Sequence, residues 1–218
     1  MPKSNPDYIK NTWANFHRNG DVGPLTGTSF EHTVKPYGLD LLSLKGLNVL
    51  EIGVGFGLSI KGFWDKGCNV YALDICEEAF SCVSSHIKGG FLHEEAEKLP
   101  EGFFDLAICH LVTQHMSETD ILKQFPYVIR SLKPNGFLCV QFAYSDIPEE
   151  NNQKQTVVGT PGDNQVSMLG GRMVRTPEYA AELIERCGGK VVYVSGMTKF
   201  PQFKSGWYYM KIVKAEKI

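Results

Sequence analysis

Three glycines at alternate positions follow a short apolar run and form the sharpest chemical feature of the sequence. The segment reads VLEIGVGFG, in which Glu51 precedes Gly53, Gly55 and Gly57. Glycine permits tight turns and lets a ligand approach the backbone without a Cβ in the way. The following residues, LSIKGFWD, have a helical pattern, and the first amide groups of a helix favour a polar ligand. The pattern predicts a loop that wraps part of a polar cofactor.

The spacing of the glycines and one carboxylate narrow the choice of cofactor. A dinucleotide fingerprint, G-x-G-x-x-G, would need a glycine at position 58, where the chain has Leu58. The spacing therefore argues against a nicotinamide cofactor. Asp74 ends a second apolar run, VYALD. A carboxylate at that place can accept the hydroxyls of a ribose. The alternative role for Asp74 is the N-cap of a helix over EEAF.

The elements that must position these residues alternate between strand and helix. Apolar runs at 47–53, 69–74, 103–112 and 136–143 leave room for helices between them, which predicts βαβ units and a parallel, buried sheet. Ser117 predicts the start of a helix that runs to about Leu132, and Thr176 the start of another that ends at Gly188. The last two runs, 190–196 and 207–214, are joined too closely for a crossover helix, so we expect them to pair antiparallel.

Taken in order, these motifs resemble those of a known family. Glu51-x-Gly53-x-Gly55-x-Gly57, Asp74, the AEKLP segment and LKPNG together resemble a class I S-adenosylmethionine-dependent methyltransferase. The nearest branch is the type 11 group of small-molecule enzymes, which includes quinone-biosynthesis methyltransferases. The resemblance implies an α/β, Rossmann-like fold. Its seven-stranded sheet would be mostly parallel, with an antiparallel C-terminal hairpin and helices on both faces.

The resemblance also implies a domain organisation. Residues 46–218 would form the methyltransferase domain, and residues 1–45 an N-terminal cap or lid segment. The polar, glycine-bearing stretch 145–175 is too long for an ordinary connection, and we expect a lid insertion there. A structureless insertion is the alternative.

The implied cofactor is S-adenosyl-L-methionine, which leaves as S-adenosyl-L-homocysteine. The residues implied to contact it are Glu51, Gly53, Val54, Gly55, Gly57, Asp74, Ile75, Glu95, Ala96 and His110. The glycines would wrap the methionine part, with Glu51 supporting their loop. Asp74 would hold the ribose.

The adenine and the sulfonium would be contacted by residues further along the chain. Ile75 would lie against the adenine ring, and Ala96 would offer its backbone amide to it. Glu95 stands where the family usually has an aspartate facing the adenine amino group. The carboxylate that would accept a hydrogen bond is kept, but its side chain is longer. His110 would lie beside the sulfonium.

Two histidines are candidates for the catalytic base. Methyl transfer mainly requires that the acceptor be placed in line with the methyl group. A hydroxyl acceptor also benefits from a base with a pKa near neutrality, and histidine is the usual choice. Of His115 and His110 we prefer His115, because His110 is implied to be a cofactor neighbour. A packed histidine without a catalytic role is the alternative for each, and Gln114 is a candidate for orienting substrate or cofactor.

The predicted activity is therefore methyl transfer to a small molecule, with a hydroxyl oxygen as the favoured acceptor. Three alternatives stay open: an N-methyltransferase of an amine or protein side chain, a non-catalytic cofactor-binding module of the same fold, and a nicotinamide oxidoreductase. The candidates for contacting the acceptor are Tyr8, Trp13, Tyr37, Arg172 and Arg175. For the aromatic residues the alternative is core or lid packing. For the two arginines a solvated surface position is favoured over a role as an anion clamp.

Composition limits the partners. The 218 residues carry 22 lysines and arginines against 24 aspartates and glutamates, a net charge of −2, with no basic stripe that would indicate nucleic acid. No apolar run is long enough to span a membrane, and the polar start lacks a secretory signal, so we expect a cytoplasmic protein. The six cysteines match neither a zinc site nor a disulfide framework, and no metal is predicted. The oligomeric state is open.

Overall fold

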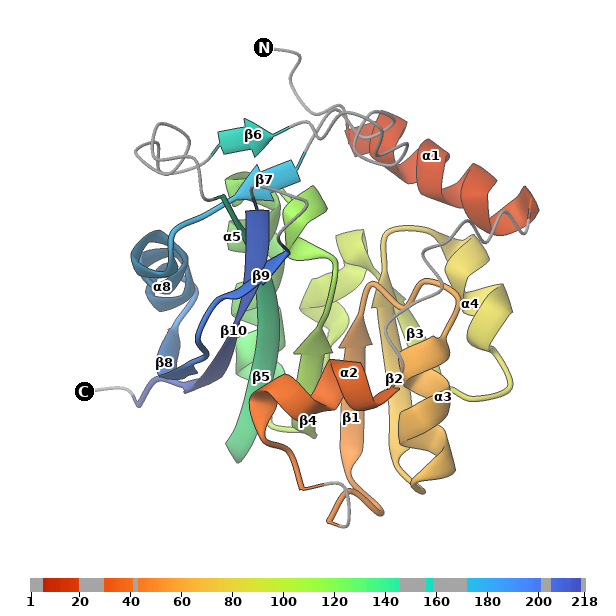
Figure 1. Ribbon diagram of the computed structural model, residues 1–218. Helices are drawn as coiled ribbons and strands as arrows, with labels where there is room; N and C mark the ends of the chain where they lie inside the picture. Colours follow the sequence, from red (N-terminus) through yellow and green to blue (C-terminus); the bar gives the residue numbers. More distant parts are fainter. Residues whose placement is uncertain are drawn as a thin grey trace.

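A mixed β-sheet forms the centre of the computed structural model (Figure 1), which describes residues 6–19, 30–40, 43–145, 156–158, 172–200 and 205–216. The main path of the sheet runs in the order β3 (Gly89–Leu92), β2 (Asn69–Asp74), β1 (Asn48–Ile52), β4 (Phe104–Cys109), β5 (Leu132–Ser145), β10 (Ser205–Lys214) and β8 (Gly189–Val194). Strands β3, β2, β1, β4 and β5 are parallel neighbours. Strand β10 is antiparallel to both β5 and β8. The predicted fold class is confirmed.

The sheet differs from the sequence-based expectation in its short strands. Strand β3 was not predicted, because GGFL offers only two apolar residues after two glycines. Strand β5 begins at Leu132 rather than at residue 136, with an irregular register where it meets the start of β4. Three further strands lie off the main path: β6 (Thr156–Val158), β7 (Arg172–Val174) and β9 (Thr198–Phe200).

Strands β6 and β7 are the described parts of the predicted lid insertion. They pair antiparallel with each other, and β7 joins β5 through Val174 and Ala143. Most of the 145–175 segment lies outside the described residues. The lid itself therefore stays a prediction, and within this segment only residues 145, 156–158 and 172–175 are described.

Helices cover both faces of the sheet (Figure 1). Helices α5 (Glu118–Ser131) and α8 (Pro177–Arg186) bury Phe125 and Leu183 in one apolar cluster. Helices α2 (Phe30–Val34), α3 (Leu58–Asp65) and α4 (Glu77–Val83) bury Phe30, Phe63 and Val83 in a second cluster on the opposite face. Short 3₁₀ turns complete the order at η1 (Lys35–Tyr37), η2 (His93–Lys98) and η3 (Thr113–His115).

Helix α1 (Pro6–Asn19) lies above α4 (Figure 1). The guanidinium of Arg18 contacts the carboxylate of Glu78 on α4 at 2.9 Å, and the ammonium of Lys10 lies 3.5 Å from the carboxylate of Glu94 on η2. These exposed ion pairs join α1 to two elements that follow parallel strands. No helix among the described residues has the length and apolar character needed to cross a membrane.

The two predicted helix starts are confirmed. The Ser117 hydroxyl accepts a hydrogen bond from the backbone N–H of Asp120, and the Asp120 carboxylate accepts from the backbone N–H of Ser117 at 2.8 Å, which is a reciprocal capping box. The Thr176 hydroxyl caps α8 by accepting a single hydrogen bond from the backbone N–H of Tyr179 at 3.2 Å, with Pro177 at the first helical position.

We expect Ser117→Ala to lower the free energy of unfolding by about 1 kcal/mol, because the first turn of α5 loses its side-chain acceptor. Ser81→Ala, an exposed change within α4, is the matched control and should shift stability by less than about 0.5 kcal/mol. Urea denaturation of both variants measures the difference. Equal midpoints for the two variants would contradict a stabilising cap at Ser117.

Candidate functional site

The order of the strands reverses at β1, because β2 lies on one side of it and β4 on the other. In open parallel sheets, ligands bind outside the carboxyl ends of the strands at such a reversal. The predicted glycine loop leaves the end of β1, and the segment with both candidate histidines leaves the end of β4. The structure thus brings the two predicted groups of functional residues to one edge of the sheet.

The glycine loop, residues 53–57, has no room for larger residues at two of its positions. A Cβ on Gly53 would lie 2.2 Å from Val112 Cγ2, and one on Gly57 would lie 2.3 Å from Val83 Cγ1. Both glycines also have positive φ angles of 71° and 78°. A Cβ on Gly55 would meet no described atom within 4 Å. Open space beside Gly55 is what a backbone that cradles a ligand requires.

The carboxylate of Asp74 holds the glycine loop in place. Its Oδ2 accepts a hydrogen bond from the backbone N–H of Val54 at 2.9 Å, and its Oδ1 accepts from those of Ile75 and Cys76 at 2.7 and 3.2 Å. The side chain is only 7% exposed. Burial raises its pKa, and these three hydrogen bonds together with the nearby His17 oppose that rise. Asp74 thereby joins the end of β2 to the loop that follows β1.

Glu51 places a second carboxylate below the same loop. It is buried in β1, and its Oε2 has no hydrogen-bond partner among the described residues. Burial raises the pKa of Glu51 from its ordinary 4.5 to about 8, with the negative charge of Asp74 adding to the rise and Ser59 opposing it. A buried carboxyl group of this kind gains a favourable interaction only when a cation or a donor comes next to it.

His110 is buried at the end of β4. Its ring stacks on that of Tyr209, with centroids 6.0 Å apart and planes 17° apart. The ring of Tyr209 in turn meets Tyr37 edge-on at 5.4 Å. The Tyr37 side chain is buried and its hydroxyl has no hydrogen-bond partner within the described part of the chain. Tyr37, a candidate acceptor contact, thus lies in the wall behind His110.

The segment that carries His115, residues 111–116, is called here the histidine turn. It begins with Leu111 in a left-handed conformation, φ 60°, which non-glycine residues rarely adopt and which often marks a functional site. Gln141 of β5 holds this start, because its Oε1 accepts from the Leu111 N–H at 2.7 Å and its backbone oxygen accepts from the Thr113 hydroxyl at 2.6 Å. Two hydrogen bonds to Gln141, one part-buried and one buried, therefore support the strained turn.

Helix α1 meets both parts of the site. The ring of Trp13 packs edge-on against His115 at 5.7 Å. The ring of His17 lies 4.9 Å from that of Phe56 in the glycine loop. Gln114 is also close to His115, with Nε2 atoms 3.1 Å apart. Sequence reasoning did not identify His17 or Gln141, since neither belongs to a motif and only the folded chain brings them to the site.

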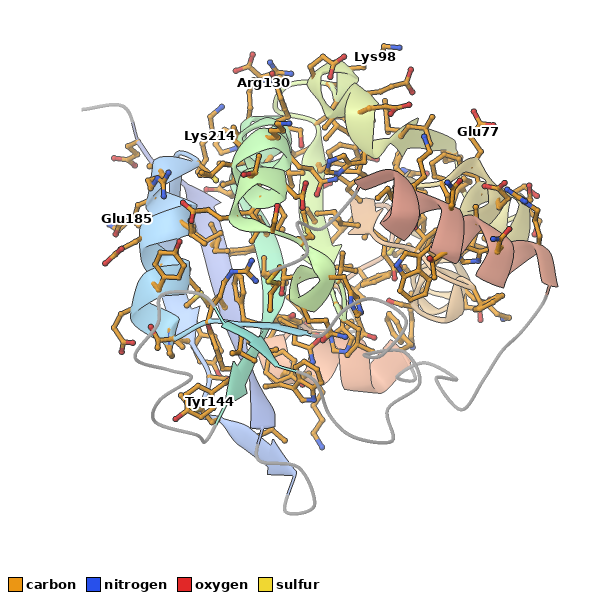
Figure 2. All side chains as sticks on the ribbon, turned by 90° about the horizontal axis from the view of Figure 1, so that it is seen from above. Glu77, Lys98, Arg130, Tyr144, Glu185 and Lys214 are labelled. Carbon is orange, nitrogen blue, oxygen red and sulfur yellow. The ribbon has the colours of Figure 1, made fainter. Side chains whose placement is uncertain are left out.

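The residues expected at the adenine occupy the elements after β2 and β3. Ile75 is half-buried, Ala96 is buried in η2, and Glu95 is partly exposed. The carboxylate of Glu95 pairs with the ammonium of Lys98, which projects from the outer rim of the molecule (Figure 2). Contacts between these residues and an adenine ring stay predictions.

Of the remaining candidates for contacting the acceptor, the structure describes the side chain of Arg175 but not those of Tyr8 and Arg172. The surface position favoured for Arg175 is wrong, because its side chain is 1% exposed. It was missed because nothing local in the sequence distinguishes a buried arginine from a solvated one. The side chains of Tyr8 and Arg172 lie outside the described residues. Among the residues that the structure describes, no group of three histidines, cysteines or acidic residues could hold a metal ion.

Residues 50–140 match a family model described as a methyltransferase domain. Curated relatives include the ubiquinone biosynthesis O-methyltransferase of Dechloromonas aromatica, 27% identical over 131 aligned residues that cover 54% of this chain and 53% of the relative. The enzyme of the same name from Rickettsia canadensis is 24% identical, over 61% of this chain and 58% of its own length. The chain therefore spans little more than half the length of these relatives.

Solved structures share the fold over a larger part of the chain. A 1,6-didemethyltoxoflavin-N1-methyltransferase from Burkholderia thailandensis, with its substrate and S-adenosylhomocysteine bound, gives a TM-score of 0.71 at 15% identity. The match covers 99% of this chain and 93% of that one. A phosphoethanolamine N-methyltransferase from Haemonchus contortus, in complex with S-adenosyl-L-methionine, gives 0.62 at 17% identity, over 86% and 52% of the two chains.

The raised pKa of Glu51 predicts how stability depends on pH. The unfolded chain loses the Glu51 proton above about pH 4.5, whereas the folded protein keeps it up to about pH 8. Its contribution to stability is therefore complete below pH 4.5 and falls as the pH rises to 8. We expect Glu51→Gln to raise the melting temperature more at pH 8 than at pH 5. A thermal unfolding series over this range measures the effect, and an equal gain at both pH values would argue against a buried, protonated Glu51.

Proposed function

We propose that this chain, whose residues 50–140 match a methyltransferase-domain model, is a class I S-adenosylmethionine-dependent methyltransferase that transfers the methyl group of S-adenosyl-L-methionine to a small-molecule acceptor. The matched methyltransferase domain and the shared fold support the cofactor and the reaction class. Because the curated relatives are matched over only part of their length, the acceptor is argued from the residues of this chain.

The observation that carries the proposal is the pair of buried carboxylates beside the glycine loop. S-adenosyl-L-methionine presents a positively charged amino group and a ribose diol. The unpartnered Oε2 of Glu51 suits the amino group, and the carboxylate of Asp74 suits the diol. The open space next to Gly55 suits a ligand that lies against the backbone. The residues present therefore fit the cofactor.

Asp74 would act in both loop geometry and ribose recognition. An ionised carboxylate has about four lone-pair sites, and backbone N–H groups use three of them here. The Cys76 thiol also lies 3.7 Å from Oδ1, whereas Oδ2 accepts only from Val54, so Oδ2 is the oxygen that would accept a ribose hydroxyl. Glu51 would ionise when an ammonium group comes next to it, since an adjacent cation lowers the pKa of a carboxyl group.

The bound cofactor supplies an electrophilic methyl group on its sulfonium. The chain then has to place the acceptor in line with that group and, for a hydroxyl acceptor, remove its proton. His115 is our choice for the base, because Trp13 and Gln114 orient its ring and the histidine turn holds its backbone. His110, buried against Tyr209, would line the cofactor side of the reaction centre.

We favour a hydroxyl oxygen as the acceptor because two histidines stand at the end of β4. Curated relatives that carry the name O-methyltransferase support this choice. The alternative is a nitrogen acceptor, which the names of two structural neighbours suggest. Helix α1 would cover the acceptor, as part of the N-terminal cap in residues 1–45.

We expect S-adenosylhomocysteine to bind the purified protein in a calorimetric titration, whereas NADH does not. Asp74→Asn should weaken this binding at least tenfold, since an amide cannot accept all three backbone hydrogen bonds and its donor group would face one of them. Asp65→Asn, an exposed change at the end of α3, is the matched control. Binding of NADH instead would overturn the family's cofactor for this chain, and unchanged affinity in Asp74→Asn would overturn the ribose assignment.

We expect His115→Ala to reduce methyl transfer by about 100-fold or more, within the range typical of a lost general base, with affinity for S-adenosylhomocysteine changed less than twofold. Transfer of labelled methyl groups to panels of phenols and amines measures turnover and also identifies the acceptor atom. His110→Ala should weaken cofactor affinity instead. If the two variants show the opposite pattern, His110 is the base.

A further inference from the structure

Arg175 is a buried cation that contacts the histidine turn at two points. Its Nη1 donates to the backbone oxygen of Thr113 at 2.9 Å, and its Nη2 donates to that of Met116 at 2.5 Å. These two oxygens lie on either side of Gln114 and His115. The guanidinium therefore bridges the residues that flank the candidate base.

The charge of Arg175 is costly at this position. Its side chain is 1% exposed, and its Nε has no hydrogen-bond partner among the described residues. The nearby carboxylate of Glu118 is already bonded to the Tyr179 hydroxyl at 2.5 Å and to Arg186 at 2.6 Å. Burial lowers the pKa of Arg175 to about 10, so the side chain is still charged at neutral pH. An apolar side chain of similar volume would avoid this desolvation cost.

The backbone of Arg175 is fixed as firmly as its guanidinium. Its N–H donates to the oxygen of Ala143 in β5 at 2.9 Å, and its oxygen accepts from the buried Tyr208 hydroxyl at 3.0 Å. Arg175 lies between β7 and the N-cap of α8. A rigid part of the sheet thus supports the side chain that reaches the histidine turn.

We propose that Arg175 is a positioning residue for His115, a role that rests on the function proposed above. Gln141 holds the start of the histidine turn, and Arg175 holds its end. The planar guanidinium can bond two carbonyl oxygens at once in a fixed geometry, which the single ammonium of lysine does not reproduce. Without this bridge the turn loses its second support, and the His115 ring loses its fixed place.

The test uses two substitutions in the full chain with S-adenosylhomocysteine bound. Arg175→Met removes the charge and both hydrogen bonds but keeps apolar volume, and Arg175→Lys keeps the charge without the fork. Arg186→Met, which alters an exposed arginine on the same side of the molecule, is the control. The main readout is the imidazole NMR signal of His115 in protein labelled at histidine, identified by its loss in His115→Gln.

We expect the His115 signal to shift or broaden in both Arg175 variants and to stay unchanged in Arg186→Met. Affinity for S-adenosylhomocysteine should change less than twofold. Methyl transfer, measured on the acceptor that the phenol and amine panels identify, should fall by about 100-fold, as a misplacement of about 1 Å can cause.

The proposal is overturned if the His115 signal is unchanged in both variants. It is also overturned if both variants unfold, because Arg175 then supports the fold as a whole. If Arg175→Met unfolds and Arg175→Lys does not, the His115 signal of Arg175→Lys decides whether the proposal stands. A shifted signal together with full turnover in His115→Ala would keep the positioning role and reject His115 as the base, so the two proposals can fail separately.

Discussion

The carboxylate of Asp74 is the interaction on which the rest of the site depends. It lies at the end of β2, yet one of its oxygens fixes the backbone of Val54 in the loop after β1. The backbone N–H groups of a loop that wraps a ligand cannot all pair with other backbone groups, and a buried N–H without a partner is costly. Asp74 supplies an acceptor and so stabilises an open glycine loop before any ligand is bound. Binding then requires less ordering of the chain, which favours affinity.

Most of the scaffold could be predicted from the sequence because its signals are local. The apolar runs around Val49 and Ile108 and the caps at Ser117 and Thr176 depend on residues within a few positions of one another. The glycine spacing, with Glu51 and Asp74, predicts a place for the site from equally local signals, and the roles of these residues stay predictions. The strand β3 and the short strands β6, β7 and β9 escaped prediction, because pairing with a neighbouring strand, rather than their own composition, makes them strands.

Residues that support the site through long-range contacts could not be predicted. Gln141 and Arg175 hold the histidine turn from β5 and from the start of α8, which are distant in the sequence. Arginine is a residue type usually found at the surface, yet Arg175 is buried like a core residue. Only the folded chain shows the two carbonyl oxygens to which it donates hydrogen bonds. His17 likewise reaches the site because α1 packs on α4. Such contacts are a property of the tertiary structure and leave no periodic pattern.

The close contact between Gly53 and Val112 has a consequence for redesign. The glycine loop and the histidine turn touch at this point with no space for even one methyl group. In a tightly packed interior, displacement of one segment is passed to the other. The positions of the glycine loop and of the histidine turn are therefore coupled at this contact. Under the proposed function, a variant intended for a bulkier acceptor would have to gain its space on the α1 side, where the contacts of Trp13 with His115 and of His17 with Phe56 are made by side chains and not by backbone.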